Sequence, residues 1–432
     1  MNKETAATKS GFFYGWIIVA VSTLTLIISN GLSIGGIPVF YKPIQTDLIA
    51  SGAILASEAQ SVIANGATLT FLLAGFSAPF AGYLIQKFSL RLLMCVGCVI
   101  LGSGLLLHSQ ATSVNVIYFS RILFGISLGF FGVMTNVVLV SNWFRRLRGT
   151  VLGIVLTGTS IGGVLIPLAA TPLILQFGWR TAMILISLLI WLVLFPAIIL
   201  LVKNRPADIG LLPDGEIENN GRKTKGEEQI KESGSTLGEA LRTPIFWVFA
   251  LCAALIFYPI FVTSQQFILY LQSAKIGLSA QDAGIAQASL FAVSVGGKFF
   301  FGFLSDRFPA TRVMLVCCTV MFLATLVLLA LTANTAFFFL IPFGLGYGGT
   351  FVLLQLLVAD YFGTKEYGKI LGAITVIETI GAAIGGKITG YLADAAGGDY
   401  TTAFYGVILT TAMALVLTVL LNFMAKTRNA EI

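Results

Sequence analysis

The chain has 432 residues, of which 57% are hydrophobic and only 10% are charged, and its mean hydropathy is +0.92. A water-soluble domain of this size needs far more charged surface, so the composition excludes that class and favours a helical protein that crosses the membrane many times. The net charge of +7 lies mostly in short loops between apolar segments, which indicates orientation in a bilayer rather than binding to nucleic acid.

Twelve apolar segments follow one another, each long enough to cross about 30 Å of hydrocarbon as an α-helix. They are too long for β-barrel strands and do not alternate in polarity. They lie at about 14–41, 57–86, 90–109, 113–142, 148–176, 179–203, 244–273, 279–307, 311–331, 334–362, 367–395 and 400–425. We therefore predict an all-α membrane protein with twelve transmembrane helices in two six-helix, pseudo-symmetric halves.

One long polar stretch separates segment six from segment seven. It has almost no apolar residues to bury, which predicts a flexible linker with a short surface helix near Leu237. We expect an N-terminal bundle over 1–203, a cytoplasmic linker over 204–243 and a C-terminal bundle over 244–432. No removable signal peptide is expected, because the first residues lack an apolar core followed by a small-residue cleavage site.

Lys and Arg are distributed unevenly between the loops. With both termini in the cytoplasm, about 20 of the 26 basic residues fall in cytoplasmic segments, and three (Lys42, Arg180 and Lys275) fall outside. The remaining three lie within apolar segments. Because cytoplasmic loops carry an excess of Lys and Arg, we expect a multi-pass protein of the cell membrane with both termini in the cytoplasm.

A Gly-x-Leu-x-Asp-Arg element ends segment eight and consists of Gly302, Leu304, Asp306 and Arg307. A weaker copy begins at Gly82, about 220 positions earlier, with Gln86 and Lys87 in place of the acid and the base. A charged turn repeated between apolar helices is typical of transporters built from two similar halves.

The twelve segments, the central polar stretch and the paired element together resemble the major facilitator superfamily over nearly the whole chain. The basic turn and glycines of residues 144–162 are similar to the monocarboxylate-transporter signature, and Phe13-Tyr-Gly-Trp16 resembles the entry motif of that group without its acidic residue. Lys298 lies where monocarboxylate and oxalate–formate carriers place a substrate-binding Arg. At two positions, Lys298 and Ser294, this sequence departs from the pattern of those carriers. Lys cannot clamp a carboxylate with two parallel bonds, and Ser294 replaces the acid of the monocarboxylate group, which places that group's proton coupling in question.

In this superfamily the paired element latches the two halves together on the cytoplasmic side. The resemblance implies this role for five residues: Gly302, Asp306, Arg307, Gly82 and Arg91. Because Gln86 replaces the acid in the first copy, we expect a weaker latch there.

Lys298 lies inside the apolar part of segment eight, about 12 Å along the helix from Asp306. Ser294 and Gly302 share its helix face. Cations inside membrane helices are costly and tend to mark functional sites. We expect Lys298 to bind substrate; the alternative is an ion pair that joins two helices.

Three further charges are embedded in the apolar segments. Glu378 and Lys387 flank the polar face of segment eleven. Glu378 lies at the depth of Lys298 and either carries a proton or forms an ion pair, whereas Lys387 lies closer to the outside and is a candidate for substrate binding. Arg121 begins a glycine stripe on segment four, where we expect a structural anchor, with proton coupling or ion pairing as the other possibility.

Four neutral polar residues near the midplane complete the candidate pocket: Asn30, Tyr258, Gln265 and Tyr347. As a set they fit a small hydrogen-bonding pocket, although each one alone is equally suited to bonding a neighbouring helix.

The embedded cations outnumber the single central acid, which favours a small organic anion, a mono- or dicarboxylate, as the substrate. We therefore predict a secondary transporter that works by alternating access, through proton symport or anion exchange. A proton-driven exporter of neutral or amphiphilic compounds and a membrane sensor that binds solute without moving it are the alternatives.

Enzymatic activity is not expected, because the sequence has no His cluster, no nucleophile–base motif and no metal-ligand spacing. We expect no cofactor and no metal. The expected partners are the organic anion, protons in the case of symport, and the lipid bilayer. We expect no nucleic-acid partner, and we expect the protein to be a monomer.

Overall fold

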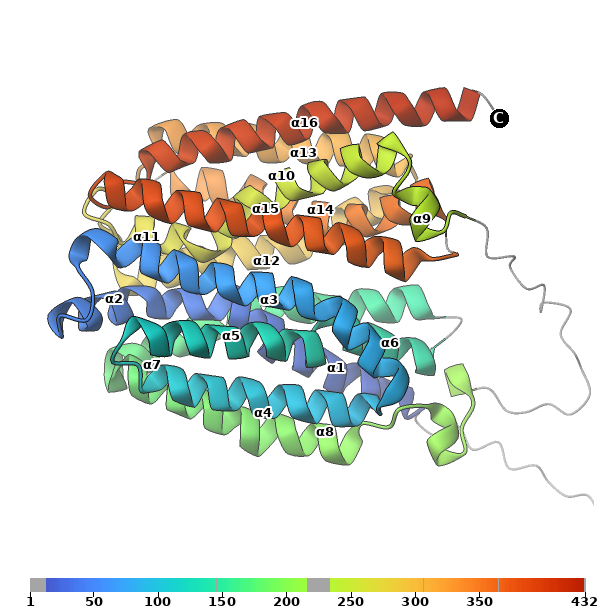
Figure 1. Ribbon diagram of the computed structural model, residues 1–432, viewed down its shortest axis with the longest axis horizontal. Helices are drawn as coiled ribbons and strands as arrows, with labels where there is room; N and C mark the ends of the chain where they lie inside the picture. Colours follow the sequence, from blue (N-terminus) through green and yellow to red (C-terminus); the bar gives the residue numbers. More distant parts are fainter. Residues whose placement is uncertain are drawn as a thin grey trace, which may run out of the picture.

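The computed structural model describes residues 13–144, 147–215, 234–305, 307–333, 335–363 and 365–430. Nearly all of these residues are helical, and none of them forms a β-strand. The helices from α1 to α8 lie side by side with the helices from α10 to α16, as two sets (Figure 1).

The first set comprises α1 (Gly15–Asn30), α2 (Tyr41–Ala50), α3 (Ala59–Lys87), α4 (Leu90–Ser109), α5 (Val114–Phe131), α6 (Val133–Trp143), α7 (Arg148–Leu189) and α8 (Phe195–Leu201). The short helix α9 (Leu237–Ala240) precedes the second set, which comprises α10 (Pro244–Gln265), α11 (Phe267–Leu271), α12 (Ala280–Ser305), α13 (Ala310–Leu326), α14 (Ala336–Phe362), α15 (Tyr367–Ala395) and α16 (Thr401–Ala430). Helix α9 confirms the short helix expected near Leu237.

Eleven helical stretches of the described chain are long and apolar enough to cross a membrane. One of them, Val151–Leu201, has 51 residues and would be about 77 Å long as one helix, more than twice the hydrocarbon thickness. Its path breaks at Gly178, whose φ of 79° lies in the left-handed region that favours glycine. This stretch therefore crosses twice, and the structure has the twelve crossings that the sequence predicts.

The two ends of the bundle differ in what they carry. The distal end carries α2 and α11, and the terminal end carries α9 and the described C-terminal part of α16 (Figure 1). The turn at Gly178 between two crossings lies at the distal end, where Trp179 is beside α2 and Arg180 donates to the carbonyl oxygens of Ser109 and Ala111.

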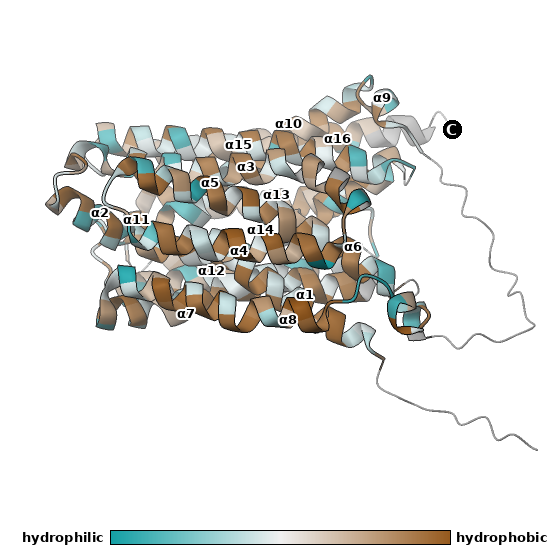
Figure 2. Ribbon diagram, turned by 60° about the horizontal axis from the view of Figure 1, so that its bottom comes forward, coloured by the Kyte–Doolittle hydropathy of each residue, from teal (hydrophilic) through white to brown (hydrophobic). Residues whose placement is uncertain are grey.

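Apolar stretches, coloured brown, run along the helices of the bundle in Figure 2. Large apolar side chains are exposed on α4, on the crossing that ends with α8, on α13 and on α16; examples are Leu92, Leu192, Leu323 and Val416. Helices of this kind keep every backbone polar group bonded inside the helix, which is what a bilayer requires.

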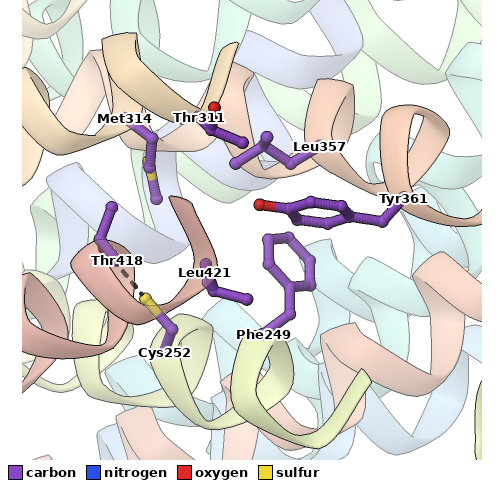
Figure 3. Close-up of a pocket in the computed structure, with 8 residues that line it drawn as sticks. All are labelled: Phe249, Cys252, Thr311, Met314, Leu357, Tyr361, Thr418 and Leu421. Carbon is purple, nitrogen blue, oxygen red and sulfur yellow. Dashed lines mark hydrogen bonds between the residues drawn. The ribbon is translucent and has the colours of Figure 1, made fainter. Parts of the chain in front are cut away.

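A narrow pocket lies within the second set, between α10, α13, α14 and α16 (Figure 3). Cys252 Sγ lies 3.4 Å from Thr418 Oγ1 at one side of it, and Phe249 and Tyr361 close another side. The pocket has no space for a water molecule, so it is an imperfection in packing and not a route for a solute.

Candidate functional site

Lys298 lies where α12 of the second set packs against α7 of the first set. Its ammonium group donates to Ser160 Oγ at 2.7 Å, to Thr159 Oγ1 at 2.9 Å and to the carbonyl oxygen of Leu156 at 3.4 Å. Lys298 is only 7% exposed and forms no ion pair with a carboxylate in the described part of the chain. The positive charge is therefore held by neutral oxygens alone, which leaves it available to an anion.

The surroundings of Lys298 are polar on one side and aromatic on the other. Ser294 Oγ lies 3.0 Å from Ser160 Oγ on the polar side. The Phe351 ring lies with its centroid 5.0 Å from Lys298 Nζ, a distance that suits a cation–π interaction. Tyr347, one helical turn before Phe351 on α14, is buried, and its hydroxyl makes no hydrogen bond with a described residue. This group can surround a small anion that carries an apolar part.

Glycines allow the helices around Lys298 to approach closely. A Cβ on Gly348 of α14 would overlap the carbonyl oxygen of Ser294, and a Cβ on Gly163 of α7 would overlap the ring of Phe291. Phe291 in turn packs against Tyr347, with ring centroids 6.0 Å apart. These contacts fix α7 and α14 on either side of α12, and so they fix the neighbours of Lys298.

Glu378 is also buried, with 7% exposure, on α15. It forms neither a hydrogen bond nor an ion pair with any residue that the structure describes. The possible pairing between Glu378 and Lys298 is therefore not formed here. A buried carboxyl group without a cationic partner is favoured in its neutral form, because burial penalises the charge.

Arg121 is 1% exposed and belongs to a different cluster. Its guanidinium carbon lies 5.1 Å from the centre of the Tyr41 ring, and it pairs with no described carboxylate. The Tyr41 hydroxyl donates to Gln265 Oε1 at 2.7 Å, and Gln265 Nε2 donates to the carbonyl oxygen of Ile34 at 2.6 Å. Arg121 and Gln265 thus lie at a contact between the two sets, nearer the distal end than Lys298.

Asp394 of α15 strengthens this contact at the distal end. Its two carboxylate oxygens accept from the backbone N–H groups of Gln60 at 3.0 Å and Ser61 at 2.7 Å, which begin α3 of the first set. The first N–H groups of a helix have no partner within it and carry partial positive charge, so a carboxylate there is stabilising. Tyr400 and Gln45 both donate to Gln60 Oε1 and extend the network.

Every hydrogen bond between the two sets, among the residues described, lies between the level of Lys298 and the distal end. The bundle is therefore closed at its distal end. Among the described residues, Lys298 makes the hydrogen bonds between the two sets that lie nearest the terminal end.

A family model described as the Major Facilitator Superfamily matches residues 19–276 and 267–430. The chain belongs to the major facilitator superfamily. It is thus a multi-pass membrane transporter that acts on a small-molecule substrate.

Three curated relatives match most of the chain. The MFS transporter asaE of Aspergillus flavus is 27% identical over 95% of this chain and 88% of its own length. Monocarboxylate transporter 12 of Xenopus laevis is 26% identical over 76% of this chain and 73% of its own. The oxalate:formate antiporter of Oxalobacter formigenes is 22% identical over 96% of this chain and 94% of its own length.

A solved structure has the same fold. It is a bacterial homologue of the human lysosomal transporter Spinster in an inward-facing, unoccupied conformation. Its TM-score is 0.63 with 17% sequence identity, and the match covers 95% of each chain.

The remaining predicted substrate residues of this superfamily member lie apart from Lys298. The Tyr258 ring packs against Gly385 of α15, with its hydroxyl toward Gly406 of α16. Asn30 ends α1, and its Oδ1 accepts from Ser29 Oγ at 3.2 Å. Lys387 is exposed on the outer face of α15, among exposed Ile384 and Ile388. Of the predicted set, Tyr347 packs against α12, the helix of Lys298, through the Phe291 ring two turns earlier.

The predicted latch residues lie toward the terminal end. The Arg307 guanidinium lies 4.3 Å from the centre of the Phe303 ring, and Gly302 is half-buried on α12. Gly82 is part of α3, and the backbone N–H of Arg91 donates to Asn204 Oδ1 at 3.0 Å. Asp306 lies outside the described residues, so the latch stays a prediction.

Sequence reasoning missed Thr159, Ser160 and Phe351. The two hydroxyl residues follow Thr157 and Gly158 inside an otherwise apolar segment, and this cluster was the available signal. Phe351 gave no signal, because the sequence contains 34 Phe residues and most of them simply face lipid or core.

Proposed function

We propose that the protein is a secondary transporter of a small organic anion, a mono- or dicarboxylate, with Lys298 as the anion-binding residue. The observation that carries this proposal is a buried ammonium group whose described partners are all neutral oxygens. Buried charges in membrane helices are expensive and are retained where they serve a function. Relatives named as a monocarboxylate transporter and an oxalate:formate antiporter support the same class of substrate.

The substrate carboxylate is expected to accept hydrogen bonds from Lys298 and from the hydroxyls of Thr159 and Ser160. Bonds of this charge-assisted kind are short, about 2.7–2.9 Å. The ammonium belongs to the second set and the hydroxyls to the first, so one ligand contacts both sets. A ligand with such contacts changes the relative stability of open and closed states, which is what alternating access requires.

We further propose that the two sets act as two bundles, over 1–203 and 244–432, joined by the linker 204–243. The uneven distribution of Lys and Arg supports a cytoplasmic terminal end in the cell membrane, which makes the distal end external. The described state is then closed to the outside.

Glu378 is the proposed proton site. It is the buried acid on a helix that packs against both α3 and α10, and it has no described partner. Ser294 occupies the position of the acid used by the monocarboxylate group, so a proton-coupled mechanism needs another carboxyl group.

Uptake into proteoliposomes tests the proposal. A radiolabelled monocarboxylate or dicarboxylate should accumulate, and unlabelled organic acids should compete whereas neutral analogues of the same size should not. Saturable binding without uptake would favour a sensor. Uptake that neutral or amphiphilic compounds inhibit, and organic acids do not, would favour an exporter of such compounds.

A further inference from the structure

A second cavity, of about 460 Å³, lies at the distal end and is separate from the Lys298 site. One part of its wall comes from α2 and from the distal part of α7, through Lys42, Asp47, Thr171 and Trp179. The opposite part comes from the second set, through Gln272 and Ala280. Because both sets supply the wall, the cavity keeps this shape only while the distal ends lie together.

The charges around this cavity favour an anion. Three basic residues, Lys42, Arg180 and Lys275, lie at the distal end, and two of them are paired: Arg180 with Asp47 at 2.6 Å, and Lys275 with Asp399 at 3.1 Å. Lys42 is exposed and has no ion pair or side-chain hydrogen bond with a described residue. Since Arg180 offsets the charge of Asp47, Lys42 is the uncompensated charge among the side chains that line the cavity.

Thr171 provides a polar group without a partner. The residue is 7% exposed, lines the cavity, and its Oγ1 is buried with no hydrogen-bond partner among the described residues. Buried hydroxyl groups are normally bonded, often to a carbonyl one turn earlier in the helix. The Thr171 hydroxyl lies against Gly284 of α12, where the two sets pack together beside the cavity.

The cavity also lies at the edge of the bilayer. Thr171 is roughly 35 Å along α7 from its first residue, just beyond the hydrocarbon thickness of about 30 Å. Leu175, which is 63% exposed, continues the wall toward lipid, and Trp179 is of the residue type enriched at the membrane–water interface. A ligand here would have its head at the level of the lipid headgroups and its apolar part along α7.

We propose that this cavity binds an anionic phospholipid of the distal leaflet. The lipid phosphate pairs with Lys42, and an acyl chain lies along Leu175. A volume of this size is typical of small-molecule sites and accommodates a headgroup. Because both sets form the wall, the bound lipid stabilises the state that is closed at its distal end. The proposal does not depend on the identity of the transported substrate.

Trp179 makes the proposal measurable. The protein is reconstituted in nanodiscs that contain either brominated phosphatidylglycerol or brominated phosphatidylcholine, since bromine quenches nearby tryptophan fluorescence. The difference between the natural chain and Trp179→Phe isolates the signal of Trp179 from the other Trp residues. We expect Trp179 to be quenched several-fold more by the anionic lipid, and Lys42→Gln to reduce this to the level seen with phosphatidylcholine.

Lys275→Gln is the matched control, because it removes a distal lysine that does not line the cavity; it should keep the preference for the anionic lipid. Asp394→Asn weakens the distal contact and should reduce the preference; no change would overturn the link to distal closure. Equal quenching by both lipids, or a preference that survives Lys42→Gln, would overturn the site. Displacement of the brominated lipid by millimolar glycerol phosphate would show a site for soluble anions and overturn the lipid assignment.

Discussion

Replacing Lys298 with Gln should abolish binding of a carboxylate while leaving the protein folded. The ammonium group is buried and its three described partners are neutral, so the variant leaves no charged group unpaired. Truncating one partner of a buried, hydrogen-bonded charge pair costs about 2–5 kcal/mol of binding free energy. Even the lower figure corresponds to binding that is roughly 30-fold weaker.

The affinity is measured from the rise in melting temperature with ligand concentration, since a ligand of the native state stabilises it by mass action. Lys298→Arg keeps the charge in a differently shaped group and should keep part of the affinity. Lys387→Gln is the matched control, because it removes the same charge from an exposed position. Unchanged affinity in Lys298→Gln, in a variant that melts like the natural protein, would refute the role of Lys298.

Three further changes test coupling and conformation. Glu378→Gln should abolish uptake driven by a pH gradient yet preserve substrate exchange, both measured in proteoliposomes; if the variant still concentrates substrate on a proton gradient, Glu378 is structural. Asp394→Asn removes the negative charge and one acceptor at the N-terminus of α3, worth about 1 kcal/mol, and should raise distal labelling of a Cys placed at Ala64 about five-fold; unchanged labelling would contradict the role of this contact. Asp306→Asn should slow transport but leave equilibrium binding within a few-fold, because the sequence predicts about 12 Å of helix between Lys298 and Asp306; lost binding with intact folding would contradict this.

The crossings could be predicted from the sequence because each one depends only on its own length and polarity. The break between segments five and six is an example. The sequence predicts a gap between residues 176 and 179, and the structure turns at Gly178. Burial of Lys298 could also be predicted, because a cation in an apolar helix avoids lipid.

The partners of buried groups could not be predicted, because they depend on which helices pack together. Nothing in the sequence places Ser160 beside Lys298, 138 positions away, or Asp394 at the first N–H groups of α3. Lys387 shows the same difficulty. Helical spacing places it at the edge of a polar face, and the position of α3 and α10 decides that this edge is exposed.

The central claim is that Lys298 binds the carboxylate of the transported anion between the two sets of helices. The most direct test is an experimental structure of the protein with an organic acid that raises its melting temperature. The account predicts a carboxylate oxygen about 2.7–2.9 Å from Lys298 Nζ, with Ser160 or Thr159 donating to the same group. An acid bound elsewhere, with Lys298 still bonded to Ser160 and Thr159 as in the empty protein, would contradict it.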